Sequence, residues 1–263
     1  MTIKSKVSGE FAQMITCQLD AGQTVYSDAN KYRWKTVNVG IETRLTTPGG
    51  KADEQRKSGG FLAGALGAAT EIAKRAVAGQ SLAFQWFSAS GGSGLVAFAG
   101  ETPGQVRSID LDGGIGWFAE RQAFICAEQS VAFDIAYSGL GMGRRSGEGL
   151  FLEHFTGSGT IVIAGGGSIV EVNPADYGGK IQIHAGAVVG FADSISYGVE
   201  HVGALNAQTL MTVAFGGQGL SVITLSGDGP VLLQSTLHRT MEQEQERNDM
   251  ERHSRGGGLL DRL

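Results

Sequence analysis

Three segments of this chain share one pattern of spacing, and the pattern restricts the fold more than any other sequence feature. Each segment has a leucine, a phenylalanine five residues later, a glycine-rich turn and then a short aliphatic run. Short aliphatic or β-branched runs bounded by glycine are typical of β-strands. We therefore predict three equivalent β-hairpins, whose leucine and phenylalanine pairs are Leu82 with Phe87, Leu150 with Phe155 and Leu210 with Phe215, and whose following strands lie at 95–98, 161–164 and 221–225.

The spacing between these hairpins predicts an all-β fold of three pseudo-repeated units. Successive leucines of the pattern are 68 and 60 residues apart, which leaves room for upstream strands such as 123–126 and 187–191. Each unit is too small to bury its own apolar face well, so the units should share a core as a β-sandwich or a double-stranded β-helix-like body. We expect a single β body at 1–236, with repeats near 7–105, 106–172 and 173–236, and a polar C-terminal tail at 237–263.

Two segments depart from the β pattern. Residues 45–60 are polar and turn-rich and predict an exposed loop, while the Ala-rich stretch 61–77 predicts a short helix. The tail at 237–263 is charged and then glycine-rich, so we expect it to be helical or disordered. Glycine supplies 42 of the 263 residues without a three-residue period, and 41% of residues are hydrophobic, which excludes collagen and low-complexity disorder.

The charge balance argues against a nucleic-acid partner. Lys and Arg number 21 against 26 Asp and Glu, a net charge of −5, whereas phosphate binding depends on clustered cations. The uncharged stretch 202–227 is as long as a membrane span, but its glycine-rich break at 216–219 favours a hairpin, so we expect no transmembrane segment. The N-terminus has no apolar leader, and Cys17 and Cys126 form no disulfide framework, so we expect a cytoplasmic protein.

No motif predicts a catalytic, cofactor or metal site. The five histidines include no His-x-His pair, the glycine strings match no phosphate-binding loop, and no nucleophile elbow is present. His154 is expected on a strand beside Phe155, and the three tryptophans are expected in the core. One cluster of charged residues remains, and it consists of Arg144, Arg145 and Glu148. These residues could contact an anion or a partner, or they could belong to an exposed loop with an internal ion pair.

Short motifs in a fixed order run along most of the chain: Leu-Asp-Ala-Gly at 19–22, Gly-Gln-Ser-Leu at 79–82, Pro-Gly at 103–104, Gly-Glu-Gly-Leu-Phe at 147–151 and Gly-Pro-Val-Leu-Leu-Gln-Ser at 229–235. Their order resembles the altered-inheritance-of-mitochondria (mitochondrial biogenesis, twenty-four) family, whose biochemical function is uncharacterised. The resemblance implies self-association and a fold resembling the tryptophan-RNA-binding attenuation protein (a TRAP-like fold). It does not imply RNA or tryptophan binding, because the basic RNA-contacting pattern is not recognisable here.

These observations together predict a non-enzymatic oligomeric scaffold or binding module. Three repeats leave open strand edges, which soluble proteins normally cover or pair, so we expect a homo-oligomer. A trimer is the first hypothesis, with the repeat edges and the Ala-rich segment 61–77 contributing to the contact. A protein partner could bind the tail at 237–263. Two alternatives stay open: a small-molecule binding protein or enzyme with a site between repeats or subunits, and, as a weaker one, a nucleic-acid-binding protein.

Overall fold

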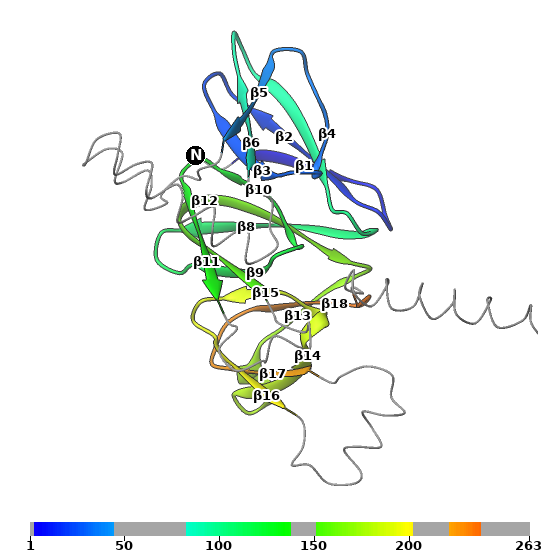
Figure 1. Cartoon of the computed structure of the whole chain (residues 1–263), viewed down its shortest axis with the longest axis vertical. Coiled ribbons are helices and arrows are strands. Elements are labelled where there is room, and N and C mark those ends of the chain that lie inside the picture. Colours follow the sequence, from blue (N-terminus) through cyan, green and yellow to red (C-terminus); the bar gives the residue numbers. More distant parts are fainter. Residues whose placement is uncertain (1–2, 45–82, 138–150, 202–220, 238–263) are drawn as a thin grey trace, which may run out of the picture.

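The computed structural model describes residues 3–44, 83–137, 151–201 and 221–237, and these residues form β-strands almost throughout (Figure 1). Within them, eighteen strands and two single-turn 3-10 helices follow one another along the chain. The predicted all-β fold is therefore confirmed. The described residues include no helix of the length and hydropathy that a membrane span needs.

An N-terminal sheet of four strands lies at one end of the molecule (Figure 1). Its strands, in spatial order, are β1 (Lys4–Ser8), β2 (Met14–Leu19), β7 (Gly94–Ala99) and β4 (Tyr32–Lys35). Side chains along β2 alternate, because Ile15, Cys17 and Leu19 are fully buried while the residues between them are half-buried. The sheet therefore packs one face on a core and turns the other face outward.

A central sheet of eleven strands forms the body of the molecule. Nine strands follow one another in the order β13-β18-β15-β9-β12-β10-β3-β6-β5, and β8 and β11 also pair with β12. Their bounds are β3 Thr24–Asp28, β5 Val39–Arg44, β6 Phe84–Ala89, β8 Gly104–Asp112, β9 Trp117–Glu120, β10 Phe124–Glu128, β11 Val131–Tyr137, β12 Phe151–Gly166, β13 Ile169–Val172, β15 Val188–Ala192 and β18 Val231–Gln234.

A small C-terminal sheet lies at the opposite end from the N-terminal sheet (Figure 1). It has the order β14-β17-β16, and all its pairs are antiparallel. Two 3-10 helices pack beside it. The bounds are β14 Lys180–His184, β16 Ser196–His201, β17 Ser221–Ser226, η1 Pro174–Tyr177 and η2 Ala185–Ala187.

Three hydrophobic cores separate these layers, and strands of the central sheet feed two cores at once. On β3, Val25 enters the N-terminal core and the next residue, Tyr26, enters the central core. On β9, Trp117 enters the central core and Phe118 packs against the C-terminal core. Adjacent residues of a strand point to opposite faces, so a strand between two cores must be apolar on both sides. This explains the continuous apolar runs of the sequence.

The first predicted hairpin is wrong. Its arms are β6 and β7, but β6 pairs with β3 and β5 in the central sheet, whereas β7 pairs with β2 and β4 in the N-terminal sheet. The glycine turn at 90–93 instead carries the chain between facing sheets, because Phe87 and Phe98 pack in the same core with ring centroids 5.1 Å apart. The strand predicted at 95–98 is confirmed.

The second predicted hairpin is also wrong, because β12 runs from Phe151 to Gly166 as one strand. Gly157 and Gly159 have φ of 98° and 148°, and a Cβ on Gly157 would lie 2.9 Å from the carbonyl oxygen of Ser130. These glycines permit a distorted backbone and close approach to a neighbouring segment rather than a chain reversal. The start of β12 pairs with β9 and β11, and its later part pairs with β8 and β10, so one strand links different regions of the body.

Other expectations have mixed outcomes. The strands predicted at 123–126 and 221–225 are confirmed by β10 and β17, and β15 confirms the one at 187–191. Phe87 and Phe155 are both fully buried, but Phe215 lies outside the described residues, so the threefold repeat stays a prediction. The predicted loop, the Ala-rich helix and the tail beyond Leu237 also lie outside them.

Candidate functional site

The charged group predicted from the sequence is not placed by the structure. Arg144, Arg145 and Glu148 lie outside the described residues, so their anion or partner contact stays a prediction. Within the described ranges, no group of three or more His, Cys, Asp or Glu side chains could hold a metal ion. The candidate sites below come from contacts between distant segments.

A buried lysine joins two loops at the junction of the N-terminal and central sheets. Lys31 has only 2% of its side chain exposed, and its Nζ lies 3.0 Å from Glu101 Oε1. The same Nζ donates a hydrogen bond of 3.1 Å to the carbonyl oxygen of Gln122. Because burial of an unpaired ammonium is very costly, these two contacts compensate the Lys31 ammonium for the water it loses.

Glu120 is the second ionisable group at this junction. Burial raises the pKa of Glu120 to about 7, and this outweighs the hydrogen bond from the Gln122 backbone and the nearby charges of Arg121 and Lys31, which lower it. The Gln122 N–H donates to Glu120 Oε2 at 2.8 Å. Near neutral pH, Glu120 is therefore divided between its protonated and ionised forms, the condition that suits a proton donor or acceptor.

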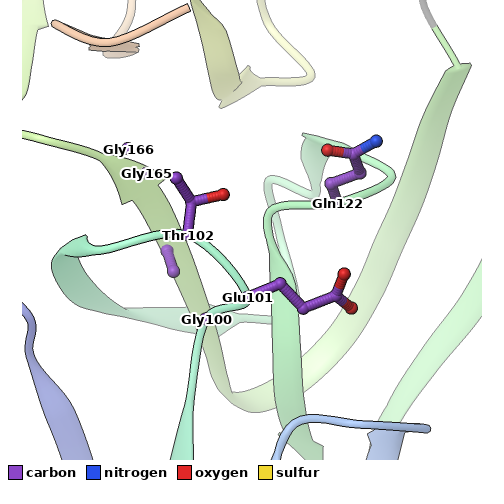
Figure 2. A pocket seen from close by; sticks show the side chains of 7 residues that line it. Gly100, Glu101, Thr102, Gln122, Gly165 and Gly166 are labelled. Carbon is purple, nitrogen blue, oxygen red and sulfur yellow. The ribbon is translucent and has the colours of Figure 1, made fainter. Parts of the chain in front are cut away.

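A shallow pocket opens beside this junction (Figure 2). Figure 2 shows Glu101 and Gln122 on separate segments near the strand that carries Gly165 and Gly166. The pocket volume of about 230 Å³ includes open solvent and falls below the roughly 300 Å³ at which ligand pockets usually begin. A Cβ on Gly165 would lie 2.9 Å from Ile169 Cγ1, so close packing explains that glycine without a ligand.

A histidine and an aspartate meet near the start of β12. His154 Nε2 lies 3.3 Å from Asp193 Oδ2, and the same carboxylate oxygen accepts a 2.9 Å hydrogen bond from the Gly116 N–H. The Phe118 ring stacks on His154 with centroids 4.3 Å apart. As predicted, His154 lies on a strand beside Phe155. Among the described residues, His154 contacts Asp193 and Phe118 rather than a hydroxyl or thiol nucleophile, so the pair orients an imidazole without completing a triad.

The two cysteines, which are 109 residues apart, meet in the N-terminal core. Cys17 and Cys126 are fully buried free thiols, on β2 and β10. Burial, together with the hydrogen-bonded Cys17 thiol, raises the pKa of Cys126 well above its ordinary value. Cys126 therefore remains protonated and unreactive at neutral pH, as expected for a packing residue.

The outward face of the N-terminal sheet is the largest feature that the sequence analysis did not anticipate. Strand register places Lys6, Thr16, Ala97 and Trp34 in one row across β1, β2, β7 and β4. The four strands carry four basic residues and no acidic residue. Burial confirms core positions for two of the three tryptophans, but the same prediction for Trp34 is wrong, because it is 40% exposed.

These sites share a reason for being missed. Lys31 lies 70 residues before Glu101 and 89 residues before Glu120, so no spacing motif connects them. Trp34 sits in an apolar context, and its outward direction follows only from the pairing of β4 with β7. The sequence signal that could have indicated this sheet face is the presence of basic residues, without acidic ones, in the segments that form its strands.

The chain is similar to a known protein family and to two proteins of Streptococcus pyogenes. The family model described as Mitochondrial biogenesis AIM24 matches residues 5–236. An uncharacterised protein of Streptococcus pyogenes serotype M6 is 27% identical over 223 residues, covering 84% of this chain and 81% of that protein. A crystal structure of a Streptococcus pyogenes protein has a TM-score of 0.65 at 20% identity, covering 95% of this chain and 99% of the other. This match supports the fold, but it does not confirm the TRAP-like resemblance. The match over nearly the whole length shows that the chain belongs to the Mitochondrial biogenesis AIM24 family.

Proposed function

We propose that this protein is a self-associating scaffold or binding module that acts through its surface rather than through chemistry. The observation that carries the proposal is the outward face of the N-terminal sheet. Trp34 on that face is 40% exposed, and all five residues of its edge strand β1 are exposed. A half-exposed tryptophan on a sheet face is the kind of anchor that protein interfaces use.

The edge strand supports the same proposal. Exposed sheet edges offer unpaired backbone groups, and soluble proteins protect such edges or pair them with another chain. Lys4 and Lys6 on β1 restrict which partner can pair there, since like charges directly opposite each other are destabilising. We propose a homo-oligomer, with a trimer as the first assembly to test, in a reducing compartment such as the cytoplasm, where the buried thiols stay free.

Light scattering on the purified full chain across a hundredfold dilution tests this proposal. A stable multiple of 27.5 kDa is expected. A mass of one protomer at every concentration would reject self-association. Trp34→Ser should reduce the mass, whereas Ile115→Ser, which removes an exposed apolar side chain between β8 and β9, should leave it unchanged.

Small-molecule binding is a second candidate, favoured by the polar junction around Lys31. Glu101, Gln122 and Thr102 line its pocket, and the pKa of the neighbouring Glu120 lies near neutrality. Thermal-shift screening against nucleotides, sugars, lipids and metals tests it, because a specific ligand stabilises the native state by mass action. A hit should be lost in Glu101→Gln if this junction binds it.

A further inference from the structure

We propose that copies of this chain associate head to tail, with the basic face of the N-terminal sheet of one copy docked on the acidic C-terminal end of the next. The inference rests on the proposed self-association and adds the surfaces that make the contact. The basic face is defined by Lys4, Lys6 and Trp34, and the acidic end by Glu171 and Asp176.

Charge is distributed unevenly along the long axis of the molecule. Residues 1–44, which supply three of the four strands of the N-terminal sheet, hold six basic and four acidic side chains. Residues 151–237 hold one basic and six acidic side chains. The two regions therefore carry net charges of +2 and −5, and Figure 1 shows their terminal sheets at opposite ends.

Hydrogen bonds connect the segments of the acidic end. Asn173 donates from Nδ2 to Asp228 Oδ1 at 2.8 Å, and its Oδ1 accepts from the backbone N–H groups of Ala175 and Gly229 at 3.1 Å each. These bonds tie the turn that carries Asp228 to η1, which carries Asp176. The same end exposes 65% of Tyr177. It therefore combines acidic groups on a hydrogen-bonded turn with an exposed aromatic side chain, a composition that suits an interface.

Charge decides between the ways in which two copies could meet. Two basic faces placed against each other would bring Lys4 and Lys6 close to their own copies, with no acidic residue on the four strands to pair with them. The acidic end offers the opposite charge together with exposed aromatic surface. Like-charge contact disfavours the symmetric arrangement, and complementary charge favours the head-to-tail one.

Two charge-reversed proteins test the inference. One carries Lys4→Glu and Lys6→Glu, and the other carries Glu171→Lys and Asp176→Lys. Each alone should fall to the protomer mass, because its two contact surfaces now have the same sign. An equimolar mixture should regain a higher mass, since each altered surface then finds its opposite on the other protein. Arg107→Glu, which reverses an exposed charge on β8, should leave the mass unchanged.

The outcomes separate this inference from the proposed self-association. If the unaltered chain is an oligomer but neither reversed protein loses mass, or if the mixture stays at the protomer mass, the head-to-tail contact is overturned while self-association stands. A protomer mass for the unaltered chain rejects both. Circular dichroism of each variant must match the unaltered chain. Raising the salt from 0.05 M to 0.5 M should lower the mass if charge pairing holds the copies together.

Discussion

Two strands of the same fold show opposite burial, and the difference distinguishes positions that fill a core from positions that face outward. All five residues of β10 are buried, because the strand lies between the N-terminal and central cores. All five residues of β1 are exposed, although it is paired along its length with β2. Backbone pairing alone therefore does not decide burial. The layer on either side of a strand does.

The different burial of β10 and β1 predicts where substitutions should be tolerated. In the central sheet, a side chain on either face fills a core, so truncation leaves a cavity. In the N-terminal sheet, only the inward side chains do so, and the outward ones are available for contact with another molecule. The predictions below test this division, beginning with the largest expected loss of stability.

Truncation in the central core should have the largest effect. Phe155 is fully buried, and its ring centroid lies 4.8 Å from that of Phe124 and 5.5 Å from that of Phe133. We expect Phe155→Ala to lower the free energy of unfolding by about 3–5 kcal/mol. Urea titration followed by tryptophan fluorescence measures the change. A loss below about 1 kcal/mol would contradict the role of this core.

The ion pair between the buried Lys31 and the exposed Glu101 should respond next. Glu101→Gln leaves the Lys31 ammonium buried with weaker compensation, and because the Glu101 side chain is 57% exposed to water, the loss in unfolding free energy should be only about 2 kcal/mol. Adding Lys31→Met to that variant should recover much of the loss, because it removes the buried charge itself. Thermal unfolding of the single and double variants measures both steps. Equal stability for the two variants would show that Lys31 is not held by Glu101.

Glu120 should make stability depend on pH in a defined direction. Its folded pKa of about 7 lies above the unfolded value of 4.5, so the folded state binds more protons between these values. Its contribution to stability is therefore present at low pH and lost as the pH rises through 7. Relative to the unaltered chain, Glu120→Gln should gain about 2 kcal/mol between pH 5 and pH 8. Parallel curves for the two proteins over this range would reject the raised pKa.

Removing the outward tryptophan should have the smallest effect on stability. Trp34→Ser changes a side chain that is 40% exposed, so the free energy of unfolding should fall by less than about 1 kcal/mol. Trp86→Ser is the matched control, because Trp86 is 4% exposed in the central core and should cost several times more. Equal losses in the two variants would break the comparison between outward and inward faces.

Sequence patterns predicted individual strands better than their partners. The runs at 95–98, 161–164 and 221–225 are strands, yet the first two hairpins built from them are wrong. Glycine near an apolar run indicates a change of backbone direction or a close approach, and both readings fit the same letters. For the first predicted hairpin, the packing of Phe87 on Phe98 decides between the two, because it requires the two arms to face each other across a core.

The candidate sites depended still more on contacts between distant segments. The alternation of apolar residues and the glycine punctuation are local, so the amino-acid sequence by itself determined the all-β class and the family. Which sheet each strand joins was decided only by the tertiary structure, and so were the approach of Lys31 to Glu101 and the outward direction of Trp34. The physical reason is that strand pairing and burial depend on residues far apart in the chain, and no local pattern records which of them will meet.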